Sequence, residues 1–197
     1  LSQPAQTGAV VKANAYGLGL QPVAEALAEA GCDSFWVATL DEAVALRQIL
    51  PRARIAVLGD QVEPNIQEFI GNRLTPVLNH PGAVEAWRRW AAPAAAWLHL
   101  DTGMHRLGLS PSEWQALLAE TSDWQAVGMR GIMSHYACAD DPDHPLNVQQ
   151  RDRAVAAARA AGLRLSLGNS SGIYLGAKFR GDTVRPGMAL YGLNPTP

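Results

Sequence analysis

Residues 95–134 read AAWLHLDTGMHRLGLSPSEWQALLAETSDWQAVGMRGIMS, and this stretch decides the fold class. It contains two apolar, strand-like runs, Ala95–Leu100 and Val127–Ser134, with a helical segment between them. That segment starts at Ser110, which forms a capping-box pattern with Glu113. A strand, a helix and a second strand in this order indicate one βαβ unit of a parallel sheet.

The same alternation extends over the whole chain. Apolar, β-rich runs alternate with amphipathic stretches or loops, and eight such runs occur: Ala9–Lys12, Phe35–Ala38, Arg54–Leu58, Leu74–Leu78, Ala95–Leu100, Val127–Ser134, Arg164–Leu167 and Asp182–Arg185. The last run is the least clearly marked. Thr39 with Glu42 forms a second capping box, and Gly31 is placed to end the first long helix. Residues 147–161 predict a further helix.

Eight strands with eight connections favour an α/β fold of the closed (β/α)₈, TIM-type barrel class. The chain is shorter than the roughly 250 residues usual for that fold, and an open doubly wound sheet is the alternative. We expect residues 1–193 to form the barrel and residues 194–197 to begin a linker to a further domain. In such barrels, active residues lie at the carboxyl ends of the strands.

The composition of the 197-residue chain favours a small ligand. Its formal charge is −2 and 17% of its residues are charged, so no basic surplus attracts nucleic acid. No apolar run approaches the roughly 18 residues of a membrane span. The two cysteines, Cys32 and Cys138, lack the spacing of a metal or redox pair, which favours a reducing, cytoplasmic location.

Reactive side chains gather at five of the expected strand ends. They are Lys12 with Asn14 and Tyr16, His99 and Asp101 with Arg106 close behind, Ser134 and His135, Asn169–Ser171, and Arg185. The ends near Ala38, Leu58 and Leu78 are bland by comparison.

Lys12 is the most informative of these residues, because the chain has only two lysines, Lys12 and Lys178. A lysine at a barrel mouth can be desolvated, which frees its amine to act as a nucleophile or base. The alternative is that Lys12 extends to the rim and keeps its charge in water. Lys178 lies in a predicted loop beside Arg180.

The other strand ends have a functional and a structural interpretation each. Asn169, Ser170 and the following N–H groups suit a phosphate or a helix cap. Arg185, followed by Gly187, offers a guanidinium and a close backbone approach, or a barrel-closing ion pair. His135 suits catalysis or a structural hydrogen bond. The remaining histidines form no metal-ligand pattern, and we expect no metal.

Together these segments resemble the alanine racemase family. The resemblance is carried by four segments in order: Val10–Gly17 (VVKANAYG), Leu100–Gly108 (LDTGMHRLG), Ser134–Ala137 (SHYA) and Arg185–Gly192 (RPGMALYG). They span nearly the whole chain. The match covers the barrel of that family and none of its carboxyl-terminal β-domain.

The resemblance implies a pyridoxal phosphate cofactor and a role for each matching residue. Lys12 would form the Schiff base, and Arg106 would bond the phenolic oxygen. His135 would lie against the pyridine ring and help fix Arg185, which would face the ring nitrogen. The phosphate would be held by Tyr16, Asn169 and Ser170 and by the backbone at Gly187 and Met188.

The implied activity is racemisation of L-alanine and D-alanine, which supplies D-alanine for peptidoglycan. An arginine at the ring nitrogen discourages its protonation, which limits delocalisation of the substrate carbanion and favours return of the proton. Racemisation needs a base on each face of the α-carbon. In the family, Lys12 would serve one face, and a tyrosine from the partner subunit of a homodimer serves the other. No residue here matches that tyrosine, so we expect this chain alone to be weakly active or inactive.

One position departs from the family pattern. Position 99 commonly holds a lysine, often carboxylated, that orients the arginine corresponding to Arg106; here it is His99. We expect His99 to replace it as a hydrogen-bond partner of Arg106, with a chloride or Asp101 as the alternative.

Two other functions compete with this interpretation. A barrel-only protein that carries pyridoxal phosphate without catalysis would also account for a missing second domain. The segment Asp101–Gly108 and the terminal motif through Tyr191 argue against it, because they match the racemase pattern more closely. A decarboxylase on the same barrel is disfavoured by Arg185. The small-molecule partner is therefore expected to be an amino acid.

Overall fold

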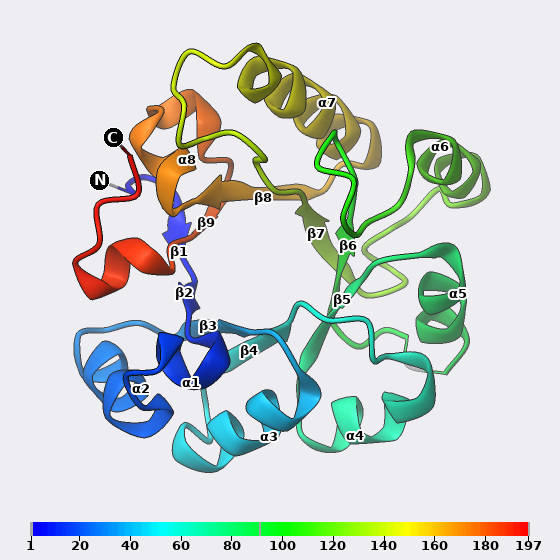
Figure 1. Cartoon of the computed structure of the whole chain (residues 1–197). Coiled ribbons are helices and arrows are strands. Elements are labelled where there is room, and N and C mark those ends of the chain that lie inside the picture. Colours follow the sequence, from blue (N-terminus) through cyan, green and yellow to red (C-terminus); the bar gives the residue numbers. More distant parts are fainter. Residues whose placement is uncertain (1, 91, 197) are drawn as a thin grey trace.

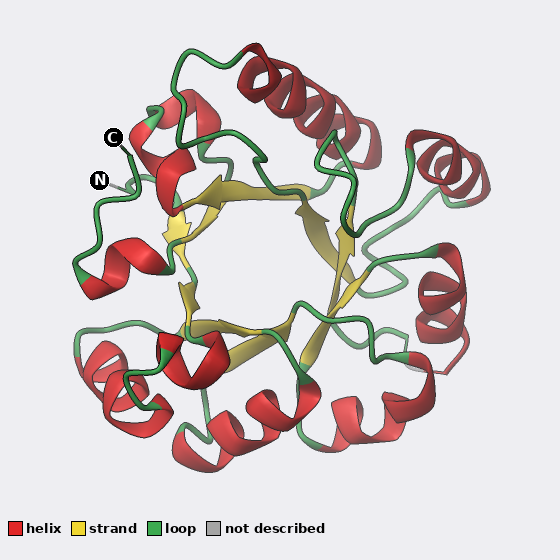
Figure 2. Ribbon diagram, viewed as in Figure 1, coloured by secondary structure: helices red, strands yellow, loops and turns green. Residues whose placement is uncertain are grey.

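In the computed structural model, which describes residues 2–90 and 92–196, parallel strands form a ring surrounded by helices (Figure 1, Figure 2). The strands are β1 (Gln6–Thr7), β2 (Ala9–Val10), β3 (Ser34–Val37), β4 (Arg54–Val57), β5 (Thr75–Leu78), β6 (Ala96–His99), β7 (Met129–Met133), β8 (Arg164–Asn169) and β9 (Thr183–Arg185). The helices are α1 (Lys12–Tyr16), α2 (Leu20–Glu29), α3 (Leu40–Ile49), η1 (Glu63–Asn65), α4 (Ile66–Gly71), α5 (Pro81–Trp90), α6 (Pro111–Glu120), α7 (Pro145–Ala161), α8 (Ser170–Tyr174), η2 (Ala177–Phe179) and η3 (Met188–Tyr191).

The ring closes because its first strand is split in two. In the sheet order β1-β9-β8-β7-β6-β5-β4-β3-β2, the two ends are β1 and β2, which Gly8 joins directly. The backbone N–H of Gly8 still bonds Val184 O at 2.8 Å. A Cβ at Gly8 would lie 2.2 Å from Nε1 of Trp36, so only glycine fits there. The (β/α)₈ barrel is therefore confirmed over the open sheet.

Each of the eight predicted apolar runs contains or overlaps a strand, and all strand pairings are parallel. Both capping boxes are present: Thr39 with Glu42 begins α3, and Ser110 with Glu113 begins α6. Gly31 follows α2 with a φ of +90° and so ends it in the left-handed region. None of the helices in the described part of the chain is long and apolar enough to cross a membrane.

Alternate residues of each strand face the helices and the barrel interior, as the two-residue period of a strand requires. On β3, for example, Phe35 and Val37 belong to the large cluster that packs against the helices. Trp36, between them, packs inside the barrel with Val10, Val77 and other inward residues. Its ring lies 5.6 Å from that of Trp97. This layer of side chains fills the barrel interior below the carboxyl ends of the strands.

Candidate active site

A cavity of about 400 Å³ opens at the carboxyl ends of the strands. It brings together all the site residues that the sequence predicts, which are Lys12, Tyr16, Arg106, His135, Asn169, Ser170, Arg185, Gly187 and Met188. Lys178 does not line it and is exposed in η2. A second hollow of about 570 Å³ lies at the amino ends of the strands, away from these residues. The upper cavity is thus the candidate site, since barrel chemistry takes place at that face.

Lys12 leads from β2 into a left-handed turn. It is half-buried, and the four residues after it, Ala13 to Tyr16, have φ angles of +52° to +56°. Left-handed backbone costs roughly 1–2 kcal/mol for each residue other than glycine, so surrounding contacts must hold it. The N–H of Ala15 bonds Val11 O at 2.9 Å, and the side chain of Asn14 accepts from Leu20 N at 2.7 Å. These contacts fix where the lysine leaves the backbone.

Glu42 also supports this turn, a role that its capping box did not reveal. One carboxylate oxygen accepts from the backbone N–H groups of Ala38 and Thr39, as expected at the start of α3. The other accepts from the N–H of Ala13 at 2.6 Å. The same carboxylate therefore caps a helix and holds the left-handed turn beside Lys12.

A polar cradle lies on the side of the cavity formed by α8 and η3. The hydroxyl of Ser170 accepts from the backbone N–H of Gly187 at 2.9 Å and of Ala189 at 3.2 Å. A Cβ at Gly187 would lie 2.2 Å from the Tyr16 hydroxyl, so the hydroxyl can approach the backbone here only because residue 187 is glycine. Asn169 caps α8 through a bond from Gly172 N. Hydroxyls and N–H groups in this arrangement suit an anion.

Arg185 is buried at the end of β9, with 4% of its surface exposed. Its guanidinium donates to Ser166 Oγ and to Ser134 O, each at 2.6 Å. Burial, and secondarily the charge of Arg106, lowers the pKa of Arg185 to about 9, so it remains charged at neutral pH. Both partners are neutral, so among the described residues Arg185 does not form the barrel-closing ion pair of the structural alternative.

His135 lies between Arg185 and Asn169. Its Nδ1 is 3.4 Å from an Arg185 nitrogen, and its Nε2 is 3.3 Å from the Asn169 amide nitrogen. Burial, then the charges of Arg185 and Arg106, lowers the pKa of His135 to about 3. The ring is therefore neutral and can accept a hydrogen bond through only one nitrogen.

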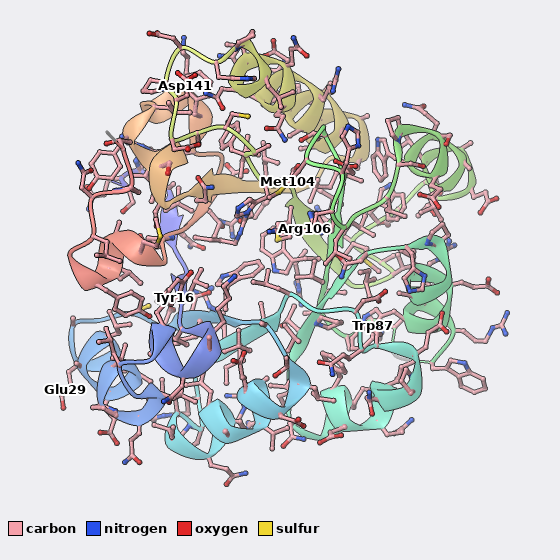
Figure 3. All side chains as sticks on the ribbon, in the orientation of Figure 1. Tyr16, Glu29, Trp87, Met104, Arg106 and Asp141 are labelled. Carbon is pink, nitrogen blue, oxygen red and sulfur yellow. The ribbon has the colours of Figure 1, made fainter. Side chains whose placement is uncertain are left out.

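Arg106 projects from the loop that follows β6. Asp101 orders this loop, because its Oδ1 accepts from three successive backbone N–H groups, those of Gly103, Met104 and His105. Figure 3 labels Arg106 on this loop and Tyr16 on α1, at opposite sides of the barrel mouth. Arg106 is exposed yet lines the cavity.

The expected hydrogen bond between His99 and Arg106 is absent from the described part of the chain. His99 Nδ1 instead contacts Asn79 Oδ1 at 2.6 Å, deep in the barrel. The sequence does not predict Asn79 as a site residue, because the strand end near Leu78 is bland by comparison with the others. The available signal was its position: it is the polar residue that directly follows Leu78.

The mouth of this (β/α)₈ barrel contains an amine, an anion cradle and a buried guanidinium. This combination is typical of enzymes that bind a phosphate-containing cofactor in a barrel. The chain matches the family model "Alanine racemase, N-terminal domain" over residues 1–195. It therefore belongs to the alanine racemase family.

Similar proteins agree with this assignment. The chain is 49% identical to an alanine racemase of Rhodospirillum rubrum, over 98% of this chain and 53% of the relative. It is 48% identical to an alanine racemase of Acidiphilium cryptum, over 98% of this chain and 55% of the relative. It superposes with a TM-score of 0.93 on the Bartonella henselae alanine racemase with covalently bound pyridoxal phosphate, at 36% identity and over 98% of this chain and 58% of that one. The chain thus spans about half the length of the curated relatives it matches.

Proposed function

We propose that this chain is the cofactor-binding barrel of an alanine racemase and that its cavity holds pyridoxal phosphate on Lys12. The observation that carries the proposal is the convergence of Lys12, the Ser170 cradle and Arg185 on one cavity. The family assignment supports it, as does the cofactor in the Bartonella henselae relative.

The residues of the cavity fit this cofactor. The cradle that a Cβ at Gly187 would fill suits a phosphate, which Tyr16, Ser170 and the N–H groups of Gly187 and Met188 would bind, with Asn169 holding the start of α8. Lys12 would supply the amine for the aldehyde carbon. Arg106 would bind the phenolic oxygen, and His135 would lie against the ring beside Arg185.

The chemistry follows from the charges of this site. Pyridoxal phosphate, when bound, withdraws electrons from the α-carbon of an attached amino acid and so makes its proton removable. Arg185 keeps its proton at neutral pH, so it would oppose protonation of the ring nitrogen that it would face. This would limit charge delocalisation and favour return of a proton over loss of carbon dioxide. Lys12 would remove or return that proton on one face.

The barrel tyrosines are poor candidates for a base on the opposite face. The Tyr136 hydroxyl donates to Phe179 O, and burial raises its pKa. The Tyr191 hydroxyl donates to Val10 O, and burial raises its pKa to about 12. Tyr174 does not line the cavity. We therefore propose that the second base comes from a further domain of a partner subunit. From its family, the whole protein is proposed to be a cytoplasmic homodimer that acts on alanine.

Borohydride reduction after incubation with pyridoxal phosphate tests this proposal. Peptide mapping should find the reduced cofactor on Lys12. Lys12→Ala should abolish the labelling and the yellow colour, whereas Lys178→Ala should leave both unchanged, because Lys178 is exposed and outside the cavity. Label on Lys178 alone, or a yellow Lys12→Ala protein, would show that the assignment is wrong.

A further inference from the structure

The hydrogen bond between Asn79 and His99 is not used in the function proposed above. Both side chains are almost fully buried, with 4% and 5% of their surfaces exposed, and His99 lines the upper cavity. His99 lies two residues after Trp97 on β6, so both face the barrel interior. Gly108 makes room for the ring, since a Cβ there would lie 3.2 Å from His99 Cδ2.

The backbone determines the orientation of the Asn79 amide. Its nitrogen donates to two carbonyl oxygens, Leu58 O at 3.2 Å and Val77 O at 3.0 Å. Carbonyl oxygens only accept, so the amide nitrogen must face them and Oδ1 must face His99. Since Oδ1 also only accepts, His99 Nδ1 has to carry the hydrogen of their 2.6 Å bond.

The second ring nitrogen of His99, Nε2, is left as a hydrogen-bond acceptor if the ring is neutral. Burial, followed by the charges of Arg185 and Arg106, lowers the pKa of His99 to about 3, against a smaller opposing effect of Asp101. In a neutral ring with hydrogen on Nδ1, Nε2 is an acceptor. Nε2 lies at the tip of a side chain that lines the cavity, where the cationic groups are Lys12, Arg106 and Arg185.

We propose that Asn79 is a positioning residue that holds His99 as its Nδ1–H tautomer, so that Nε2 accepts a hydrogen bond from the Arg106 guanidinium once the cofactor is bound. Arg106 is the suitable donor, because Arg185 already donates to Ser166 and Ser134, whereas the structure gives the Arg106 side chain no hydrogen bond among the described residues. His99 orients Arg106 as a neutral acceptor. The hydrogen bond between His99 and Arg106 rests on the proposed function, whereas the tautomer of His99 does not.

The tautomer is measured on the 197-residue chain without cofactor. In protein labelled with ¹⁵N-histidine, the ring-nitrogen shifts of His99, assigned by its loss in His99→Gln, should show a neutral Nδ1–H ring. Asn79→Ala should give the Nε2–H form a substantial population. Asn147→Ala, which removes another buried asparagine away from the cavity, should leave the His99 signals unchanged. An Nε2–H ring in the unmodified chain overturns the proposal.

Two substitutions at position 99 test the effect on Arg106. Glutamine can place an oxygen near the position of Nε2, whereas asparagine reaches only that of Nδ1. The dissociation constant for pyridoxal phosphate, measured by absorbance titration, should stay near its original value in His99→Gln and rise about tenfold in His99→Asn. Arg106→Ala should remove the difference between them. Equal affinities of the two variants in the presence of Arg106 overturn the role of Nε2.

The two hypotheses fail differently. If the proposed function is wrong, no cofactor is found on Lys12 whatever the tautomer of His99. If only the positioning role is wrong, the cofactor is found on Lys12, and the histidine shifts or the glutamine and asparagine variants contradict the proposal. If Asn79→Ala does not fold, the variants at position 99 still decide the question.

Discussion

The carboxylate of Glu42 accepts a hydrogen bond from the backbone N–H of Ala13 at 2.6 Å, which ties the start of α3 to the left-handed turn after Lys12. Four consecutive residues in the left-handed region need such support. The position of the Lys12 amine therefore depends on a residue that does not line the cavity.

A comparison of substitutions at Glu42 and Glu113 separates the capping of a helix from the support of the turn after Lys12. Glu42→Ala should lower the free energy of unfolding by about 1 kcal/mol, and it should also reduce the share of Lys12 that is labelled by pyridoxal phosphate and borohydride. Glu113→Ala is the matched control, because Glu113 completes the other capping box without contacting the cavity. It should cost similar stability and leave the labelling of Lys12 unchanged. Equal labelling of both variants would contradict the link.

Gly187→Ala should fill the proposed phosphate cradle. The new methyl group would lie 2.2 Å from the Tyr16 hydroxyl, so the tyrosine must move. We expect the affinity for pyridoxal phosphate to fall at least tenfold, a loss of about 1.4 kcal/mol, in an absorbance titration. Gly71→Ala is the control, since nothing lies within 4 Å of the added Cβ. A Gly187→Ala protein with unchanged affinity would place the phosphate elsewhere.

The buried histidines predict a loss of stability in acid. The pKa values of His99 and His135 are lowered from 6.5 to about 3, so between these values the unfolded chain binds protons that the folded chain does not. Stability therefore rises with pH across this window and falls on acidification. From about pH 7 to about pH 5, each histidine should cost about 2 kcal/mol in urea unfolding. In His99→Gln the acid-induced loss should shrink by that amount; an unchanged loss would contradict the assignment.

Exchange of the α-proton tests the single base on this barrel. With pyridoxal phosphate in deuterated water, the chain should exchange the α-proton of one alanine enantiomer much faster than that of the other, because Lys12 serves only one face. Mass spectrometry measures the exchange, and chiral chromatography should find little racemisation. A protein that only carries the cofactor would exchange neither enantiomer above the rate of a Lys12→Ala control.

Much of the fold was predictable because its signals are local. Strand runs, the capping boxes at Thr39 and Ser110, and the glycine after α2 are each read from a few neighbouring residues. The candidate residues were also found, since the carboxyl ends of parallel strands meet at one face of a barrel.

The features that were missed depend on distant contacts. The need for glycine at position 8, between β1 and β2, depends on the position of the Trp36 ring, and the second role of Glu42 depends on a turn 29 residues away. The partner of His99 is Asn79, 20 residues earlier in the chain. Sequence spacing alone does not reveal these pairings, because each exists only after the barrel has closed.

Closure of the barrel requires the pairing of β1, near the start of the chain, with β9, near its end, so it must wait until β9 has been synthesised. β1 and β2 belong to the first residues made, yet β1 has no neighbour in the sheet until β9 is formed. The amine near the beginning of the polypeptide and the guanidinium near its end therefore cannot share a pocket during most of translation. We therefore expect a nascent barrel to retain a cofactor only after its final strand has emerged from the ribosome.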